Sequence, residues 1–271
     1  MKPCLNQDTL RTTPTEDFLR IAKKAEFDAV ELTIDKVELI IEKNAIGKLK
    51  KSIEDQELTV ASINGPENFN LLGHDEFSNL LARTERLASA AREIGCTLLI
   101  PVPSALKSET TKEAIVSQTA MAMRELSERC GEDIRLGLEF LGMQSCSVND
   151  LRTAVEVVRK VSKPNVGLTL DSFHMHLSES SLSGIEDLRA TEIFLIHVND
   201  SEAGDVRNLD DSKRLFPGEG VIDLRQLQTD LESLRYNGFM SLELLRPSYW
   251  QQDPIEVARK GREALRQVFG I

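Results

Sequence analysis

The chain has 271 residues, of which 41% are hydrophobic and 28% are charged, and this length and composition allow one large buried core. The 33 basic and 44 acidic residues give a formal net charge of −11, which makes nucleic acid a poor partner because an acidic surface repels phosphate. No apolar run approaches the roughly 20 residues that a membrane span needs, so we expect no membrane partner.

The cysteines and the amino-terminal residues bear on the compartment. Cys4, Cys96, Cys130 and Cys146 form no Cys-X-X-Cys pair and match no zinc-knuckle spacing. We therefore expect reduced thiols in a cytoplasmic protein. The amino-terminal MKPCLNQDTL has no apolar core of the length of a signal peptide, which agrees with that expectation.

Short runs rich in β-branched and apolar residues alternate with longer runs of helical spacing along the chain. The expected strands are residues 2–6, 29–34, 59–64, 97–102, 135–140, 166–171, 193–198 and 239–244. The expected helices are residues 15–26, 37–56, 76–94, 111–130, 148–161, 223–236 and 254–269. Residues 181–190 form a shorter segment whose helical pattern is the weakest of the series.

Residues typical of helix ends support these boundaries. Pro14 and Pro254 lie near first turns, where proline is tolerated. Asp150 precedes another helix as a capping residue. Gly95 and Gly131 follow helical runs, as glycines that end helices do.

Regular alternation of strand and helix predicts a parallel sheet. Eight such units match the α/β fold of a (β/α)8 TIM barrel, formed by residues 1–271 as a single domain. An open doubly wound sheet is the alternative, and we disfavour it because the first strand-to-helix turn lacks a glycine-rich phosphate loop. The one long irregular segment, residues 199–220, follows the seventh strand and is expected on the active-site face of the barrel.

The last four strands each end in one ionisable side chain: Glu139, Asp171, His197 and Glu243. In a barrel these strand ends converge on one mouth. Taken alone, each glutamate is usually a solvated charge, and His197 is equally consistent with a hydrogen-bonded barrel histidine. The joint pattern predicts a divalent-cation site, because clustered carboxylates repel one another without a cation.

The donor set restricts the choice of metal. Three carboxylates favour Mn²⁺ or Mg²⁺, and the imidazole also admits Zn²⁺ or Co²⁺. Four protein ligands on an octahedral ion leave open positions for substrate oxygens.

Other polar residues lie near the expected mouth. His174 follows the sixth strand and is expected to face the mouth as a substrate or outer-shell group, whereas His176 is expected at the surface. Arg246 could bind a substrate hydroxyl or carboxylate, or form a salt bridge at the rim. Arg214 precedes the Phe-Pro-Gly of the long loop, and His74 is given little weight as a site residue.

Two aromatic residues, Tyr249 and Trp250, follow the eighth strand. They could form a wall of the pocket, but packing on the last helix is the commoner role for aromatic side chains.

The segments LEFLG, LTLDSFHMH, IHVNDSE, FPGEGVIDL and SLELLRPSYW resemble the sugar isomerase/epimerase superfamily of xylose isomerase-like TIM barrels. The likeness extends over nearly the whole chain, and the DSFHxH and RPxY stretches place it nearest the inosose isomerases (2-keto-myo-inositol isomerases) of inositol catabolism.

The resemblance implies an isomerase that uses one divalent ion, Mn²⁺ foremost, with Zn²⁺, Co²⁺ or Mg²⁺ as alternatives. Its metal ligands correspond to Glu139, Asp171, His197 and Glu243, and its substrate contacts to His174, Arg214 and Arg246. The implied chemistry is proton transfer beside the carbonyl of a polyol ketone or ketose through a cis-enediolate. By this resemblance the catalytic residues Glu139 and Glu243 would lie on either side of the reacting carbon; one would remove the proton, and either the same residue or its partner would return it. Homo-oligomers are frequent in the superfamily, so that state is expected by analogy only.

Phe216 stands where the family usually has tryptophan, which is a mild change. Two other positions differ from related ketose epimerases: Ser145 replaces a second glutamate, and Ala203 replaces an arginine. A free-ketose 3-epimerase is therefore less favoured. An inosose dehydratase remains open, and a non-catalytic polyol-binding barrel is disfavoured only weakly. An apurinic endonuclease is disfavoured because it needs a histidine-rich multi-zinc cluster and a basic face, and this chain has four histidines.

Overall fold

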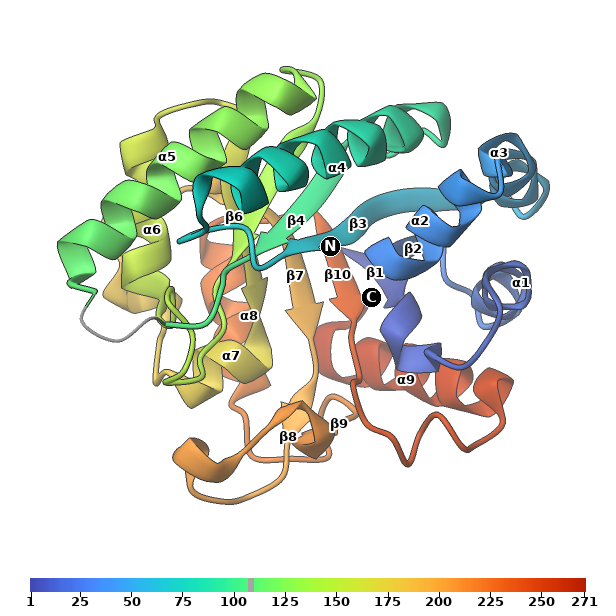
Figure 1. Cartoon of the computed structure of the whole chain (residues 1–271). Coiled ribbons are helices and arrows are strands. Elements are labelled where there is room, and N and C mark those ends of the chain that lie inside the picture. The colour runs from blue at the N-terminus through green and yellow to red at the C-terminus, as the bar shows by residue number, and fades with distance from the viewer. Residues whose placement is uncertain (107–109) are drawn as a thin grey trace.

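The computed structural model describes residues 1–106 and 110–271, and within them eight parallel strands close into a barrel (Figure 1). Around the barrel the order is β1, β10, β7, β6, β5, β4, β3 and β2. Pairing of β1 with β10, with Lys2 opposite Phe239, joins the first and last strands. The strands are β1 Lys2–Asn6, β2 Ala29–Thr33, β3 Thr59–Glu67, β4 Leu98–Val102, β5 Arg135–Glu139, β6 Val166–Asp171, β7 Ile193–Val198 and β10 Phe239–Leu242. The predicted TIM barrel is confirmed.

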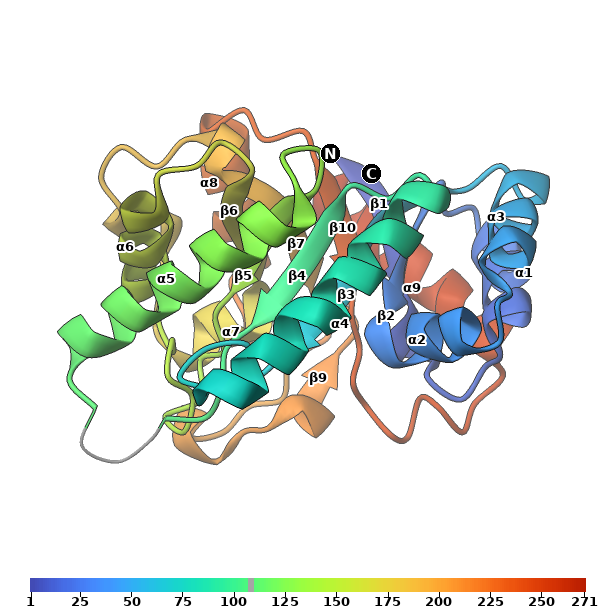
Figure 2. The ribbon, with the colours of Figure 1, turned by 45° about the horizontal axis from the view of Figure 1, so that its top comes forward.

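Helices surround the barrel, as Figures 1 and 2 show from two directions. They are α1 Thr15–Lys24, α2 Ile34–Glu42, α3 Ile46–Asp55, α4 His74–Glu93, α5 Lys112–Cys130, α6 Leu151–Val161, α7 Ser172–Leu177, α8 Leu224–Ser233 and α9 Pro254–Phe269. Side chains cap several of them: Asp150 accepts the Thr153 N–H at the start of α6, and Asp253 accepts the Ile255 N–H before α9. These caps fix where the chain turns from strand ends into helices.

Two predictions about the helices were wrong, and one helix was missed. Residues 37–56 form two helices, α2 and α3, because the chain breaks at Asn44, whose φ of 50° lies in the left-handed region. Residues 181–190 contain no α-helix, only a 3-10 turn at Leu182–Gly184 and the start of another at Ala190–Glu192. The short helix α7, directly after β6, was not predicted.

The loop of residues 199–220 is more ordered than its sequence indicates. It contains the strands β8 Asp200–Ser201 and β9 Arg214–Leu215, which pair antiparallel below the barrel in Figure 1. The buried carboxylate of Asp200 accepts the N–H groups of Gly218 and Gly220 at 3.0 and 2.9 Å. A Cβ on Gly220 would lie 2.2 Å from the carbonyl oxygen of Ser201, so this close approach requires glycine.

Apolar residues fill both the barrel and the layer between barrel and helices. A small inner cluster includes Cys4, Ala61 and Leu195, while a larger cluster lies between the strands and the helices. All four cysteines are buried and none is in a disulfide. Among the described residues, no helix combines the length and apolar character that crossing a membrane requires.

Candidate metal centre

Four side chains meet at the carboxyl end of the barrel. Glu139 and Asp171 end β5 and β6, His197 is the penultimate residue of β7, and Glu243 follows β10. Each of them offers one ligand atom, and these atoms all lie within 4.8 Å of one another. All four residues are buried, with at most 3% of their surface exposed. The structure thus brings together the four residues that the sequence analysis selected.

The spacing of the ligand atoms fits a single ion. His197 Nδ1 lies 2.7 Å from Glu139 Oε1, 3.4 Å from Glu243 Oε2 and 3.9 Å from Asp171 Oδ2. A cation held at about 2.0–2.3 Å keeps opposed ligand atoms no more than about 4.6 Å apart. Three carboxylates and one imidazole therefore suit a divalent cation in both charge and geometry.

His197 is oriented by a residue that the sequence analysis missed. Its Nε2 lies 3.0 and 3.1 Å from the two carboxylate oxygens of Glu31, which is fully buried on β2. A carboxylate at this distance accepts the proton of Nε2, and the lone pair of Nδ1 would then be available to a bound ion. The signal in the sequence was a charged residue inside the apolar run of residues 29–34.

Asp171 is held by donors on both of its oxygens. Arg214 Nη1 donates to Oδ2 at 2.6 Å, and the backbone N–H of Phe173 donates to Oδ1 at 2.7 Å. Burial raises the pKa of Asp171, but neighbouring charges, the Arg214 guanidinium foremost, outweigh burial and hold the pKa below its ordinary value. Asp171 is therefore ionised and fixed in place.

Glu243 is held by two amides and one guanidinium. Its Oε1 accepts hydrogen bonds from Asn6 Nδ2 at 2.9 Å and Asn64 Nδ2 at 3.0 Å, and its Oε2 accepts one from Arg214 Nη1 at 3.0 Å. Burial raises the pKa of Glu243 well above its ordinary value, although His197 and Arg214 oppose that shift. A divalent cation at the four ligand atoms would favour the ionised form of Glu243.

His174 carries an unused hydrogen-bond donor. Arg214 Nη2 donates to His174 Nε2 at 3.2 Å, so Nε2 supplies the lone pair and the neutral ring is protonated at Nδ1. Burial, reinforced by Arg214, lowers the pKa of His174, which keeps the ring neutral. The buried Nδ1 has no hydrogen-bond partner among the described residues. A ligand oxygen beside His174 would satisfy this donor.

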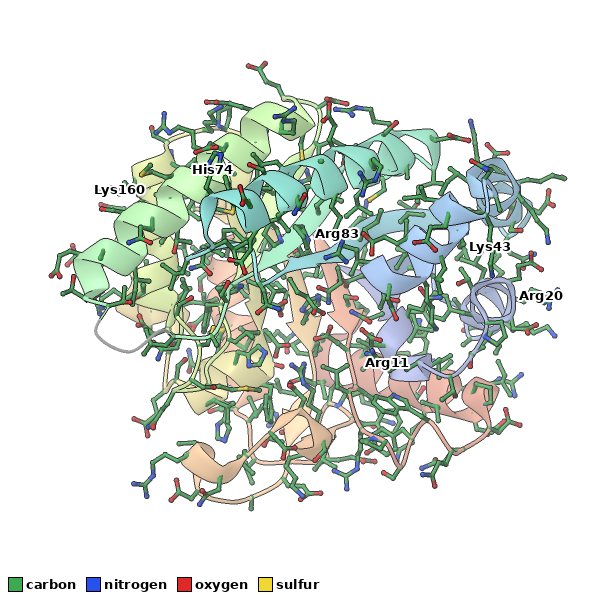
Figure 3. The ribbon with its side chains drawn as sticks, in the orientation of Figure 1. Arg11, Arg20, Lys43, His74, Arg83 and Lys160 are labelled. Carbon is green, nitrogen blue, oxygen red and sulfur yellow. The ribbon has the colours of Figure 1, made fainter. Side chains whose placement is uncertain are left out.

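A cavity of about 400 Å³ opens onto two of the four ligand residues, Glu139 and Glu243. Glu139, His174, Arg214 and Glu243 form its floor, and its walls are mostly polar. The wall residues include Asp8, Arg11, Asp35, Asn64, Glu67 and Arg83, and Figure 3 labels Arg11 and Arg83. A cavity of this size with mixed donors and acceptors suits a small molecule rich in hydroxyl groups.

Arg246 does not belong to this cavity. It donates to Glu202 at 2.7 Å and is not among the described residues that line the cavity. Of the two roles considered from sequence, the structure shows the salt bridge at the rim.

The aromatic pair after β10 packs rather than lining the site. Tyr249 packs on Phe216 with ring centroids 4.6 Å apart. Trp250 Nε1 donates to the carbonyl of Asp8 at 2.8 Å. These contacts join the final loop to the segment after β1, which contains Asp8, and to the loop after β7, which contains Phe216.

The remaining two histidines lie elsewhere. His74 begins α4 and lies outside the mouth, as its label in Figure 3 shows. The expected surface position of His176 was wrong: it is half-buried in the wall of a second cavity, and its Nε2 has no partner among the described residues.

A closed parallel barrel with three carboxylates and one histidine at its mouth is the architecture of a metal-dependent barrel enzyme. Residues 19–268 match the model of the family described as xylose isomerase-like TIM barrel, and the chain belongs to that family.

Similar proteins cover nearly the whole chain. An inosose isomerase of Halalkalibacterium halodurans is 28% identical over 271 residues, covering 99% of this chain and 96% of that protein. An inosose isomerase of Bacillus subtilis is 27% identical and covers 96% of each chain. The crystal structure of the IOLI protein with a binding zinc atom superposes with a TM-score of 0.95 at 25% identity, covering 100% of this chain and 98% of that one.

Proposed function

We propose that the protein is a divalent-metal-dependent isomerase of a cyclic polyol ketone, with 2-keto-myo-inositol as the first substrate to test. The observation that carries the proposal is the buried cluster of Glu139, Asp171, His197 and Glu243 at the floor of a polar cavity. Relatives named inosose isomerase that cover nearly the whole chain support the choice of substrate.

The four clustered residues would hold the ion. A bound divalent cation would act as a Lewis acid that polarises the substrate carbonyl and the neighbouring hydroxyl, which acidifies the adjacent C–H bond. Mn²⁺ is our first choice because oxygen ligands dominate the set, and Zn²⁺ is supported by the related structure with a zinc atom.

Glu139 and Glu243 lie on strands separated by β6 and β7, so they approach a substrate on the cavity floor from different sides. A carboxylate at this position can accept the proton from the carbon next to the carbonyl. The substrate then becomes a cis-enediolate, and return of a proton to the neighbouring carbon completes the isomerisation. General acid–base catalysis of this kind contributes about 10²–10⁴-fold to rate.

Two further residues would position the substrate. His174 Nδ1–H is an unpaired donor that a substrate oxygen can accept from, and Arg214 fixes the tautomer that makes this nitrogen a donor. Arg214 is 1% exposed and also contacts Asp171 and Glu243, so it links substrate binding to the ligand residues. We do not assign Arg246 to substrate binding, because its guanidinium bonds to Glu202 at the rim.

Proton NMR of 2-keto-myo-inositol in D₂O tests the proposal, with Mn²⁺ and with a chelator in parallel samples. We expect metal-dependent uptake of deuterium next to the carbonyl and the appearance of a second ketone isomer. Loss of water would instead show a dehydratase. No exchange on inososes or on a panel of ketoses by the metal-loaded protein would contradict the proposed function.

A further inference from the structure

Each ligand residue has a second polar atom besides the one that takes part in the contacts at His197 Nδ1, and the partners of these second atoms differ. His197 Nε2 faces Glu31, and Asp171 Oδ1 accepts the Phe173 N–H at 2.7 Å. These contacts leave His197 and Asp171 no atom with which to take a proton from a substrate.

The two glutamates are not equivalent. Glu243 Oε1 accepts two amide hydrogen bonds, from Asn6 and Asn64, at 2.9 and 3.0 Å. Glu139 Oε1 contacts His197 at 2.7 Å, but Glu139 Oε2 accepts no hydrogen bond from any of the described residues, although Glu139 lines the cavity. Glu139 Oε2 is therefore the one outer carboxylate oxygen of the cluster that a substrate proton can reach without displacing an existing donor.

The two amide donors on Glu243 Oε1 occupy the lone pairs of that oxygen, so a substrate proton could reach it only by displacing an amide. The same amides fix the side-chain rotamer that would aim Oε2 at a bound ion. Asn6 lies at the end of β1, beside β10, while Asn64 reaches the same oxygen from β3. Both amides are thus delivered by the barrel strands themselves.

We infer that Glu139 carries the proton in both directions, and that Asn6 and Asn64 are positioning residues that keep Glu243 as a ligand. The inference rests on the proposed function and specifies how the same site performs it.

In the step that follows, the C–H bond of the carbon bearing the hydroxyl breaks, and its proton passes to Glu139 Oε2. The C–H electron pair forms the carbon–carbon double bond of the enediolate, and the carbonyl π pair moves onto oxygen. Glu139 then returns the proton to the former carbonyl carbon. A new carbonyl forms at the neighbouring carbon, and the hydroxyl proton passes from one oxygen to the other.

A single base works on one face of the substrate. It can move a carbonyl between adjacent carbons, but inversion of one carbon needs a second group on the opposite face. The hydrogen bonds that hold Glu243 as a ligand therefore favour an isomerase, which moves the carbonyl between adjacent carbons, and disfavour an epimerase.

Deuterium exchange by two variants tests the role of Glu139. With Mn²⁺ occupancy verified by electron paramagnetic resonance, Glu139→Gln should lose exchange at both carbons by about 100-fold or more. Glu243→Gln, which alters a ligand, should at saturating Mn²⁺ slow exchange at both carbons by the same, smaller factor. Loss at one carbon in each variant would show two bases and overturn the inference, while the proposed function would stand.

Metal affinity tests the role of the amides without any turnover. In a chelator competition assay, the double variant Asn6→Ala/Asn64→Ala should bind Mn²⁺ about 10–100-fold more weakly. Asn208→Ala, at an exposed position in the loop before β9, is the matched control and should bind as the wild type does. At saturating Mn²⁺ the double variant should keep kcat within about tenfold, because its base is intact.

An unchanged affinity in the double variant would overturn the role of the amides. Absence of exchange by the wild-type protein on every substrate would contradict both the proposed function and the role of Glu139. The affinity measurement would still decide the role of the amides in that case.

Discussion

Glu31 shows how much of the metal centre depends on a residue that is not a ligand. It is fully buried, and its carboxylate fixes the ring of His197 through Nε2. Partners of this kind typically contribute about 10–100-fold to metal affinity.

We expect Glu31→Ala to weaken Mn²⁺ binding by about that factor, because the His197 ring loses its orientation and its tautomer. Glu31→Gln keeps an acceptor oxygen and should lose less. Competition with a chelating dye measures the Mn²⁺ affinity of both variants. An affinity of Glu31→Ala equal to that of the wild type would contradict this role of Glu31.

Asp8 gives a pH-dependent prediction in the cavity wall. Burial raises the pKa of Asp8 to about 6 although Arg11 opposes the shift, and 13% of the side chain is exposed. A folded-state pKa above the unfolded value adds stability below about pH 4 that is lost as the pH rises through about 6.

Asp8→Asn removes that loss. The variant should therefore gain stability relative to the wild type between pH 4 and 8, by at most about 3 kcal/mol. Thermal unfolding across this range measures the difference. Asp17→Asn, which removes the exposed ion pair with Arg20, is the control. A stability difference between Asp8→Asn and the wild type that does not grow with pH would contradict the raised pKa of Asp8.

At the scale of elements, the loop after β7 is built around one buried carboxylate. Asp200 accepts the N–H groups of Ser201, Gly218, Gly220 and Ile222. The strand that Asp200 begins, β8, pairs with β9, which carries Arg214. The loop therefore delivers Arg214 to the mouth.

Asp200→Ala leaves several N–H groups unpaired and should lower the free energy of unfolding by about 1–3 kcal/mol. It should also reduce substrate affinity, because β9 loses its support. Urea denaturation measures the first effect and KM the second. Asp205→Ala changes an exposed carboxylate of the same loop that caps Arg207, so it should change neither.

The elements also show what the sequence could reveal. Hydrophobic alternation predicted the eight strands of the barrel within a few residues, because each strand is buried and strand ends are marked by polar residues. The break at Asn44 was missed because the only glycine of residues 37–56, Gly47, lies after the break and inside α3, while Asn44 itself stands in an otherwise helical pattern. The order within the loop of residues 199–220 was missed because it comes from one carboxylate binding distant backbone groups.

At the scale of the whole molecule, closure of the barrel explains which site residues could be predicted. Glu139, Asp171, His197 and Glu243 each end an apolar run, so equivalent positions in repeated units indicated a common mouth. Asn6 and Asn64 gave no such signal, because neutral amides at strand ends are common in turns. Their role appears only once β1 and β3 are placed around the same barrel as β10.

Closure also predicts a coupling between metal and stability. One ion would join ligands from four units of the barrel, so it would bind the folded state and not the unfolded chain. Free Mn²⁺ at about 100 times its Kd should add about 2.7 kcal/mol, which corresponds to a rise in Tm of about 5 °C for a chain of this size. Differential scanning fluorimetry with and without chelator measures it, and an unchanged Tm at verified metal saturation would contradict the coupling.

The most direct test of the account is the metal stoichiometry of the protein, measured by isothermal titration with Mn²⁺ and with Zn²⁺. Asp171→Asn and Asp205→Asn provide a site variant and an exposed control. We predict that the wild type and Asp205→Asn each bind one ion per chain, and that Asp171→Asn loses metal binding or binds the ion far more weakly. Binding that persists unchanged in Asp171→Asn, or no binding by the wild type, would contradict it.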